Sequence, residues 1–217
     1  QIFQQQETLR QSSRLAGLIW GDALPESWIS EARSVDFFDI KGDVESLLGL
    51  GSRYEFDFEP SEHKALHPGQ GASIVRDGEQ VGLMGALHPL IQRKLGFSTP
   101  VFLFEIDLAA ILDTKLPSFK ELSKFPEVRR DLAVIVNDTI PSEAILKSVR
   151  QCAGEWLVKA VLFDVYQGAN LQSSQKSIGF SVTLQHPSRT LTDDEVNAVI
   201  DRIVASLKDG FNGILRE

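Results

Sequence analysis

The segment 177–185 alternates between large apolar and small polar side chains, and this pattern constrains the fold more than any other in the chain. Because successive side chains of a β-strand point to opposite faces, such a segment forms a strand with one buried face and one small, polar face. The apolar set is Ile178, Phe180, Val182 and Leu184, and the polar set is Ser177, Gly179, Ser181, Thr183 and Gln185.

Signals upstream of this strand predict further elements of the same domain. Apolar runs over 132–136 and 158–166 predict two more strands, each followed by turn-forming residues. Between these strands, Pro141 opens a helix that carries an apolar stripe and ends at Gly154.

A second helix is expected after the strand over 177–185. Thr192 and Glu195 have the spacing of a capping box at its start, and Gly210 is expected to end it. Residues 214–216 add a short last strand. The resulting order, βαββαβ, is ferredoxin-like, so we expect two helices on one face of a sheet whose other face stays open.

The first half of the chain is less regular and has the pattern of an antiparallel α+β domain. Asp77-Gly78 between two apolar runs is the strongest hairpin signal in the chain. Asp43 is expected to cap a helix, and Gly69-Gln70-Gly71 is expected to form a turn that enters the hairpin. The other expected elements are strands over 15–20, 54–58, 72–76, 80–86 and 101–107, and a helix from His88-Pro89 to about Gly96.

Pro117, between periodic segments, gives the best boundary, so we expect one domain over 1–117 and another over 118–217. The first has 10 basic and 17 acidic residues and a net charge of −7, and the second has 12 and 13 and a net charge of −1. An acidic first domain is suited to protein contact. A nearly neutral second domain leaves room for a local basic patch that binds phosphate.

The composition, with 42% hydrophobic and 24% charged residues, is that of a soluble globular protein. No apolar run approaches the ~18–20 residues that a membrane span needs. A single cysteine, Cys152, indicates a reducing, cytoplasmic setting. The only methionine is Met84, which leads us to expect a fragment of a longer protein.

No motif in the sequence indicates a catalytic centre. His63 and His67, with Glu62 beside them, have the spacing of two zinc ligands on a helix, but a proline follows directly and a solvated loop is the simpler interpretation. Asp36 and Asp39 form only a loose acidic pair. Because a nucleophile motif and a phosphate-binding loop are also missing, we expect neither catalytic nor metal-binding residues.

Basic and aromatic residues at the ends of elements in the second domain are better candidates for a site. A guanidinium can clamp phosphate or stack on a base, and a tyrosine can stack and hydrogen-bond at once. The alternative is that Arg129 and Arg130 pair with nearby carboxylates and that Tyr166 caps the core. The candidate RNA-binding residues are Arg129, Arg130, Tyr166, Lys176 and Arg189.

A standard RNA-recognition motif has the same order of elements, and the string 176–182 is similar to one of its signatures. That motif needs aromatic side chains on the open face of its sheet, whereas Phe180 shares the face of the buried apolar residues. We therefore expect an open face with little aromatic surface. Such a face favours recognition of the backbone and shape of a folded RNA over stacking on single-stranded bases.

The strings 124–126, 129–132, 162–166, 176–177 and 189–192 resemble the ferredoxin-fold anticodon-binding domain of the bacterial phenylalanyl-tRNA synthetase beta subunit. Gln167 departs from the pattern, since the family usually has arginine before this glycine. The resemblance continues upstream, where the catalytic-like domain of the same subunit is similar to the strings 35–45, 66–69, 85–89 and 104–107.

The resemblance implies a class II synthetase-like domain without an active site, which docks the catalytic alpha subunit in an alpha2-beta2 heterotetramer, followed by a domain that binds the anticodon region of tRNA(Phe). It also implies a cytoplasmic enzyme that uses ATP and magnesium to join phenylalanine to this tRNA, with no cofactor in this fragment. The residues themselves leave open an alternative, a regulatory or scaffold protein whose ferredoxin-like domain binds a ligand or pairs sheets.

Overall fold

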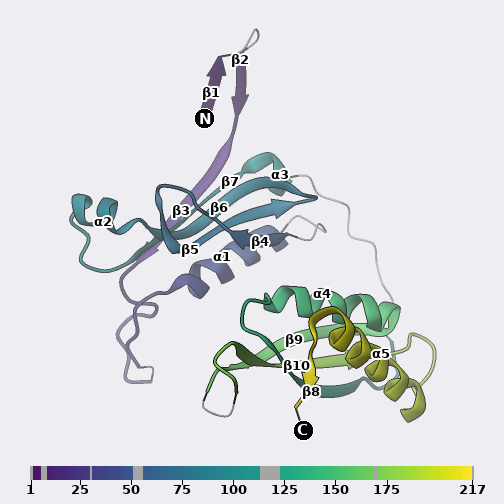
Figure 1. The fold of residues 1–217 in the computed structure, drawn as a ribbon. Helices are drawn as coiled ribbons and strands as arrows, with labels where there is room; N and C mark the ends of the chain where they lie inside the picture. Colours follow the sequence, from purple (N-terminus) through teal and green to yellow (C-terminus); the bar gives the residue numbers. More distant parts are fainter. Residues whose placement is uncertain are drawn as a thin grey trace. The chain divides into compact units, whose positions relative to one another are not determined.

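The contacts within the computed structural model divide the chain into two compact units, residues 1–118 and 119–217 (Figure 1). The first unit is coloured purple to teal in Figure 1, and the second is coloured green to yellow. The structure describes residues 2–5, 9–29, 31–50, 56–112, 123–168 and 171–216.

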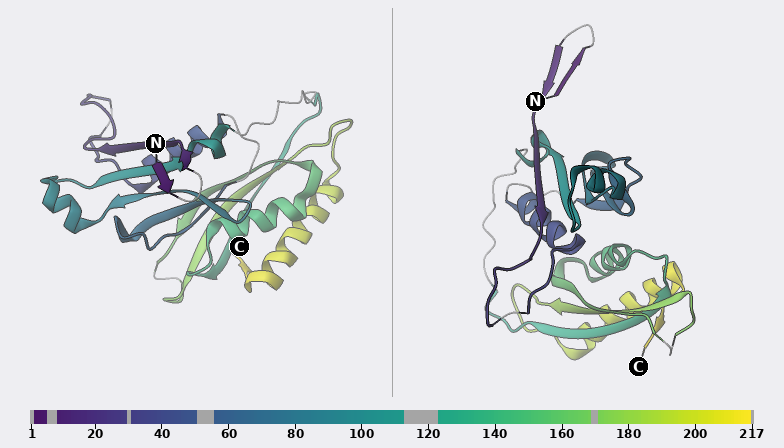
Figure 2. Two further views of the ribbon diagram at one scale, coloured as in Figure 1. Left: turned by 90° about the horizontal axis from the view of Figure 1, so that it is seen from above. Right: turned by 90° about the vertical axis from the view of Figure 1, so that its left-hand side faces the viewer.

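The first unit is built on a five-stranded antiparallel sheet with the strand order β3-β7-β6-β5-β4. Helix α1 covers one face of this sheet (Figure 2) and buries Ile40, Val44 and Leu48 against sheet residues such as Ile74 and Met84. The strands are β3 (Arg14–Trp20), β4 (Asp57–Pro60), β5 (Leu66–Arg76), β6 (Glu79–Leu87) and β7 (Val101–Asp107), and a separate pair is β1 (Ile2–Gln5) with β2 (Leu9–Ser12). The helices are α1 (Phe37–Gly49), α2 (Pro89–Leu95) and α3 (Leu108–Leu112).

The hairpin expected at Asp77-Gly78 is confirmed, because β5 and β6 pair antiparallel across it. The turn expected at Gly69-Gln70-Gly71 is wrong, since these residues lie within β5, at an irregularity of its register with β6. Close approach of the two strands explains the glycines. Gly71 pairs with Gly85, where an added Cβ would lie 2.3 Å from the backbone oxygen of Gln70.

Helix α1 begins at a capping box that the sequence analysis did not identify. The Asp36 carboxylate accepts hydrogen bonds from the N–H groups of Phe38 (2.7 Å) and Asp39 (3.1 Å), and the Asp39 carboxylate accepts one from the Asp36 N–H (2.8 Å). The cap expected at Asp43 is wrong, because that residue lies in the second turn, where backbone N–H groups already have partners within the helix. The acidic pair at Asp36 and Asp39 therefore has a structural role.

The other expected elements of the first unit agree more closely with the structure. Strands β3, β6 and β7 lie where apolar alternation predicts them, and α2 begins at Pro89 with His88 as its N-cap. The strand expected over 54–58 is found only in part, as β4 begins at Asp57, and positions 54 and 55 lie outside the described residues.

The second unit has the expected βαββαβ order, with a four-stranded antiparallel sheet in the order β11-β8-β10-β9. Helices α4 and α5 lie on one face of the sheet, and none of the unit's described elements covers the other face (Figures 1 and 2). The elements are β8 (Val128–Asn137), α4 (Ser142–Ala153), a 3₁₀ turn (Gly154–Trp156), β9 (Leu157–Tyr166), β10 (Gln175–Leu184), α5 (Asp193–Phe211) and β11 (Ile214–Leu215).

The core of the second unit follows the alternation seen in the sequence of β10. Its even-numbered apolar residues, from Ile178 to Leu184, are fully buried beneath α4 and α5. The end expected for α5 at Gly210 is wrong, because the helix continues to Phe211, which packs against this core. Asn212 then adopts the left-handed conformation (φ 51°) that ends the helix, a conformation that asparagine tolerates well.

Candidate nucleic-acid interface

The five residues predicted to bind RNA lie at two ends of the sheet and on both of its faces. At one end, Arg129 is paired with Thr183 and Arg130 with Val182; at the other end, Tyr166 is paired with Ser177. Along β10 these ends are six residues apart, or about 20 Å at ~3.3 Å per residue. The structure therefore does not bring the five residues together at one point.

Arg129 and Arg130 both have carboxylate partners. The Arg129 Nε donates to Asp131 Oδ1 (2.8 Å), and this pair lies on the open face. Arg130 shares the face of buried Val182, and its Nη2 lies 3.4 Å from Asp193 Oδ1 at the start of α5. These contacts are the ion pairs of the alternative interpretation, so the charge of each arginine is partly compensated.

Arg189 is tied to the first turn of α5. Its guanidinium donates two hydrogen bonds to Glu195, and Glu195 also completes the capping box by accepting from the Thr192 N–H (3.0 Å). The hydrogen bonds from Arg189, followed by that from the Thr192 backbone, lower the pKa of Glu195 from 4.5 to about 2. The same pairing raises the pKa of Arg189. Arg189 thus stabilises the start of α5.

Lys176 lies at the opposite end of the sheet from the arginines. It is paired with buried Val136, so it belongs to the helix-covered side, and its side chain is half-buried. It makes no ion pair with any residue that the structure describes.

The open face instead presents a contact that the sequence analysis missed. Tyr166 is paired with Ser177, whose side chain points away from the core, and the Arg216 Cζ lies 5.3 Å from the centroid of the tyrosine ring. Arg216 reaches this place because β11 pairs with β8, and its own N–H bonds to the Ala133 carbonyl (2.8 Å). No sequence pattern predicts this contact, because Arg216 simply follows the short apolar pair Ile214-Leu215.

Phe163 adds a second aromatic ring to the open face. The register of β9 with β10 is irregular between Gly179 and Phe180 and again between Thr183 and Leu184, so β9 carries bulges. At the first bulge an added Cβ on Gly179 would lie 2.9 Å from the Phe163 ring, which places that ring on the side away from the core. Its side chain is 55% exposed. The expectation of little aromatic surface on this face is therefore wrong.

The cationic and aromatic side chains of the open face, with Lys159 added to those described above, form what we call the open-face group. This group runs from one end of the sheet to the other. Lys159, opposite Thr183, is exposed and makes no ion pair with described residues. A surface that combines cations with aromatic rings is suited to a single-stranded nucleic acid, because rings stack on bases while cations meet phosphates. The open-face group consists of Arg129, Lys159, Phe163, Tyr166 and Arg216.

The histidines of the first unit do not form a ligand pair. His63 Nδ1 accepts from the Ala65 N–H (3.3 Å), and His67 Nδ1 accepts from the Gly69 N–H (3.0 Å). His67 lies in β5, so the two side chains do not share a helix face. Over the described stretches no group of three or more His, Cys, Asp or Glu side chains has the arrangement of a metal site. None of the described helices is long and apolar enough to cross a membrane.

Comparison with known proteins assigns both units. Residues 1–108 match the family model of the phenylalanyl tRNA synthetase beta chain CLM domain, and residues 123–216 match that of the ferredoxin-fold anticodon binding domain.

Whole-chain relatives agree with these matches. The chain is 50% identical over 214 residues to the phenylalanine–tRNA ligase beta subunit of Pseudomonas syringae pv. tomato, and 48% and 44% identical to those of Methylococcus capsulatus and Hahella chejuensis. These alignments cover 96–98% of this chain but only 26–27% of the relatives, so the chain spans about a quarter of their length. The chain belongs to the phenylalanyl-tRNA synthetase beta chain family and contains the CLM domain and the ferredoxin-fold anticodon-binding domain of that family.

Proposed function

We propose that the chain is the part of a phenylalanine–tRNA ligase beta subunit in which the domain over 118–217 binds the anticodon region of tRNA(Phe) through the open face of its sheet. The observation that supports this most directly is the contact of Arg216 with Tyr166 on a face that no described element of the unit covers. A cation against a half-buried ring fixes the plane of the ring and places positive charge beside any base that stacks on it.

The open-face group gives RNA a path along the sheet. Tyr166 and Phe163 offer stacking surfaces, and each base stacked on an aromatic side chain contributes about 1–3 kcal/mol. Arg129 and Lys159, which flank Thr183, offer charge at the far end of the same face. Of the residues predicted from sequence, Arg129 and Tyr166 belong to this path.

The other three predicted residues have weaker support as RNA ligands. Arg130 and Arg189 face carboxylates at the first turn of α5, where Asp193, Asp194 and Glu195 would repel phosphate. Lys176 has no ion-pair partner among the described residues but lies on the helix-covered side. We propose that Arg189 acts on the tRNA site only by holding α5 in place.

In the same proposal, the domain over 1–117 docks the catalytic alpha subunit of an alpha2-beta2 enzyme in the cytoplasm. Its net charge of −7 and its exposed apolar side chains, such as Trp20 and Phe38, are suited to a protein partner. ATP and magnesium supply the aminoacylation chemistry of the whole enzyme. The described residues of this chain offer no metal site that fits magnesium, so no step is assigned to them. The regulatory or scaffold alternative has no support from the comparisons.

The test uses the complete enzyme with Tyr166→Ala or Arg216→Gln in the beta subunit. We expect KM for tRNA(Phe) to rise about 10-fold or more from the loss of one stacked base. The rate of phenylalanine-dependent ATP–pyrophosphate exchange stays unchanged, because that reaction does not involve RNA. Arg202→Gln, which removes an exposed charge from α5, is the matched control and leaves both unchanged. An unchanged KM in both open-face variants, with normal folding, would overturn the proposed site.

A further inference from the structure

The connection between β3 and α1 is a loop with a closed neck. The Ala23 N–H bonds to the Arg33 carbonyl (2.9 Å), and the Val35 N–H bonds to the Gly21 carbonyl (2.9 Å). An antiparallel bridge joins the intervening residues Asp22 and Ser34. The two sides of the neck are thus paired like a short hairpin.

An ion pair ties this neck to helix α1. The Arg33 guanidinium donates two hydrogen bonds to the Asp39 carboxylate, each of 2.7 Å. Asp39 is also the capping-box partner of Asp36. The hydrogen bonds from Arg33, and after them the one from the Asp36 backbone, lower the pKa of Asp39 to about 2. Because one carboxylate closes both the helix cap and the neck, the base of the loop has a fixed orientation on the first unit.

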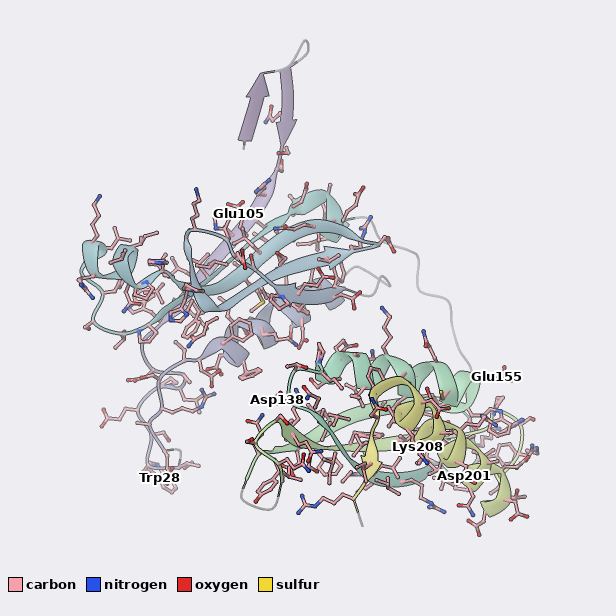
Figure 3. All side chains as sticks on the ribbon, viewed as in Figure 1. Trp28, Glu105, Asp138, Glu155, Asp201 and Lys208 are labelled. Atoms are coloured by element: carbon pink, nitrogen blue, oxygen red, sulfur yellow. The ribbon has the colours of Figure 1, made fainter. Side chains whose placement is uncertain are left out.

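The tip of the loop carries the most exposed large hydrophobic side chain that the structure describes. Trp28 is 94% exposed and the next residue, Ile29, is 77% exposed. The Ile29 N–H bonds to Ser27 Oγ (3.2 Å), which shapes the tip into a turn. Figure 3 shows Trp28 at the end of the loop, pointing away from the sheet and helices of its own unit. An exposed tryptophan on a tied loop is typical of a residue that becomes buried in an interface.

The charge around the tip argues for a protein rather than a nucleic acid as the partner. The loop 21–35 contains three acidic residues, Asp22, Glu26 and Glu31, and its one basic residue, Arg33, is neutralised by Asp39. Hollows of about 350 and 390 Å³ flank the neck, and Asp22 lines both of them. Phosphates would be repelled here, whereas lysine and arginine side chains would find carboxylates beside apolar walls.

Apolar side chains are also exposed at the base of the loop, on strand β3. The first hollow is also lined by Leu18 and Trp20 of β3, an edge strand whose outward-facing side chains are about half exposed. The loop thus offers apolar side chains at its tip and at its base, with acidic residues between them, and this mixture of apolar and charged groups is suited to a protein partner.

We infer that the Trp28-Ile29 tip is an anchor that inserts into an apolar pocket with a basic rim on the alpha subunit. This inference rests on the proposed docking role of the first unit and names the surface that performs it. The relatives are beta subunits by name, which supports another subunit as the occupant of the interface. The remainder of the beta subunit and RNA are the competing occupants.

Hydroxyl-radical footprinting of the complete beta subunit, alone and with the alpha subunit, distinguishes these occupants. We expect the peptide that contains Trp28 to be oxidised readily in the beta subunit alone and to be protected when the alpha subunit binds. Protection in the beta subunit alone would assign the tip to another part of the same chain. Protection only on addition of tRNA would assign it to RNA, and either result overturns the inference.

Affinity measurements with variants separate the anchor from docking in general. Trp28→Ala should raise the dissociation constant of the two subunits about 30-fold or more, as expected for an interface hot spot. Leu95→Ala, at an exposed apolar residue of α2, is the matched control and should leave it unchanged. Glu26→Lys with Glu31→Lys should weaken binding and reduce its dependence on salt. If Trp28→Ala binds the alpha subunit with normal affinity, Trp28 is not the anchor, although the docking role of the first unit still stands. If the unaltered subunits fail to associate, the proposed docking role itself is refuted.

Discussion

Arg189 binds Glu195 through two parallel hydrogen bonds, with 2.7 Å from Nη1 to Oε2 and 2.6 Å from Nη2 to Oε1. Both oxygens of the carboxylate are engaged, and Oε2 also receives the Thr192 N–H. The arginine is therefore part of the cap of α5, although its position just before a helix in a nucleic-acid-binding domain favours phosphate binding when only the sequence is considered.

Replacing Arg189 with glutamine should reduce stability more than RNA affinity. Loss of the two hydrogen bonds loosens the capping box, and we expect Tm to fall by a few degrees. The salt dependence of tRNA binding should keep its slope, because no phosphate contact is lost. Differential scanning calorimetry and binding titrations at several salt concentrations measure the two effects. If the slope of tRNA affinity against salt falls by about one while Tm is unchanged, Arg189 contacts an RNA phosphate and is not a capping residue.

Acid should weaken the caps of both α1 and α5. The folded-state pKa of Glu195 is about 2 against an ordinary 4.5, and that of Asp39 is about 2 against 3.8. Because both values are depressed by folding, the stabilisation is complete above about pH 4.5 and is lost as the pH falls towards 2. Urea unfolding between pH 6 and pH 2 should show this decrease. The Glu195→Gln variant should lack the part of this pH-dependent stabilisation that comes from the cap of α5. Asn197→Gln, at an exposed neighbour in the same helix, serves as the control.

Gly179 should tolerate no side chain without moving the aromatic ring beside it. An alanine Cβ would lie 2.9 Å from the Phe163 ring and 3.1 Å from the Asp164 Cβ, so the ring must shift and stability should fall by about 1 kcal/mol. RNA affinity should fall as well, since Phe163 leaves its place on the open face.

Gly210→Ala is the opposite case and the control. It lies in α5 with nothing within 4 Å of an added Cβ, so alanine should stabilise the helix by roughly 0.5–1 kcal/mol. Chemical denaturation measures both changes. The Gly179→Ala effect should shrink when Phe163 is also replaced by alanine, and an equal effect in both backgrounds would show that the clash with the ring is not its cause.

All four histidines of the chain should carry their proton on Nε2 when neutral. In each, Nδ1 accepts a hydrogen bond from the backbone N–H two residues later, over 3.0–3.3 Å. A nitrogen that accepts from an N–H cannot hold a proton of its own. Two-bond ¹⁵N–¹H correlation spectra distinguish the tautomers, and Nδ1-protonated rings at His63 or His67 would contradict the turn-capping role seen here.

Local sequence signals predicted the elements of the second domain well, because the residues that define each strand and each helix cap are close together in the sequence. The alternation of β10 and the capping box at Thr192 are read directly from neighbouring residues, and both are present in the structure. Errors arose where a residue has two possible roles. Asp43 and Asp36 are equally good caps by type, and only the burial of Ile40 with Val44 places the helix start at the earlier one.

The candidate site was harder to predict, because it depends on long-range pairing. Tyr166 and Arg216 are brought together by two strands that lie at opposite edges of the sheet. Phe163 points to the open face because a bulge shifts the parity of β9, and simple alternation does not predict a bulge. Carboxylate partners were expected as an alternative for Arg129 and Arg130, but the sequence alone did not decide between carboxylate and phosphate. The pairing of Arg189 with Glu195 was not expected.

The bulges in β9 also bear on solubility. This strand is ten residues long and lies at the edge of its sheet, where the described elements of the unit leave its outer backbone groups without a neighbouring strand. A flat edge of this length, with Val158 and Val165 half exposed, would be a template for aggregation between copies of the protein. Two bulges interrupt that edge, and Lys159 and Asp164 add charge to it. A domain whose described elements leave one whole face of its sheet uncovered is thereby protected against edge-to-edge pairing of strands from different copies.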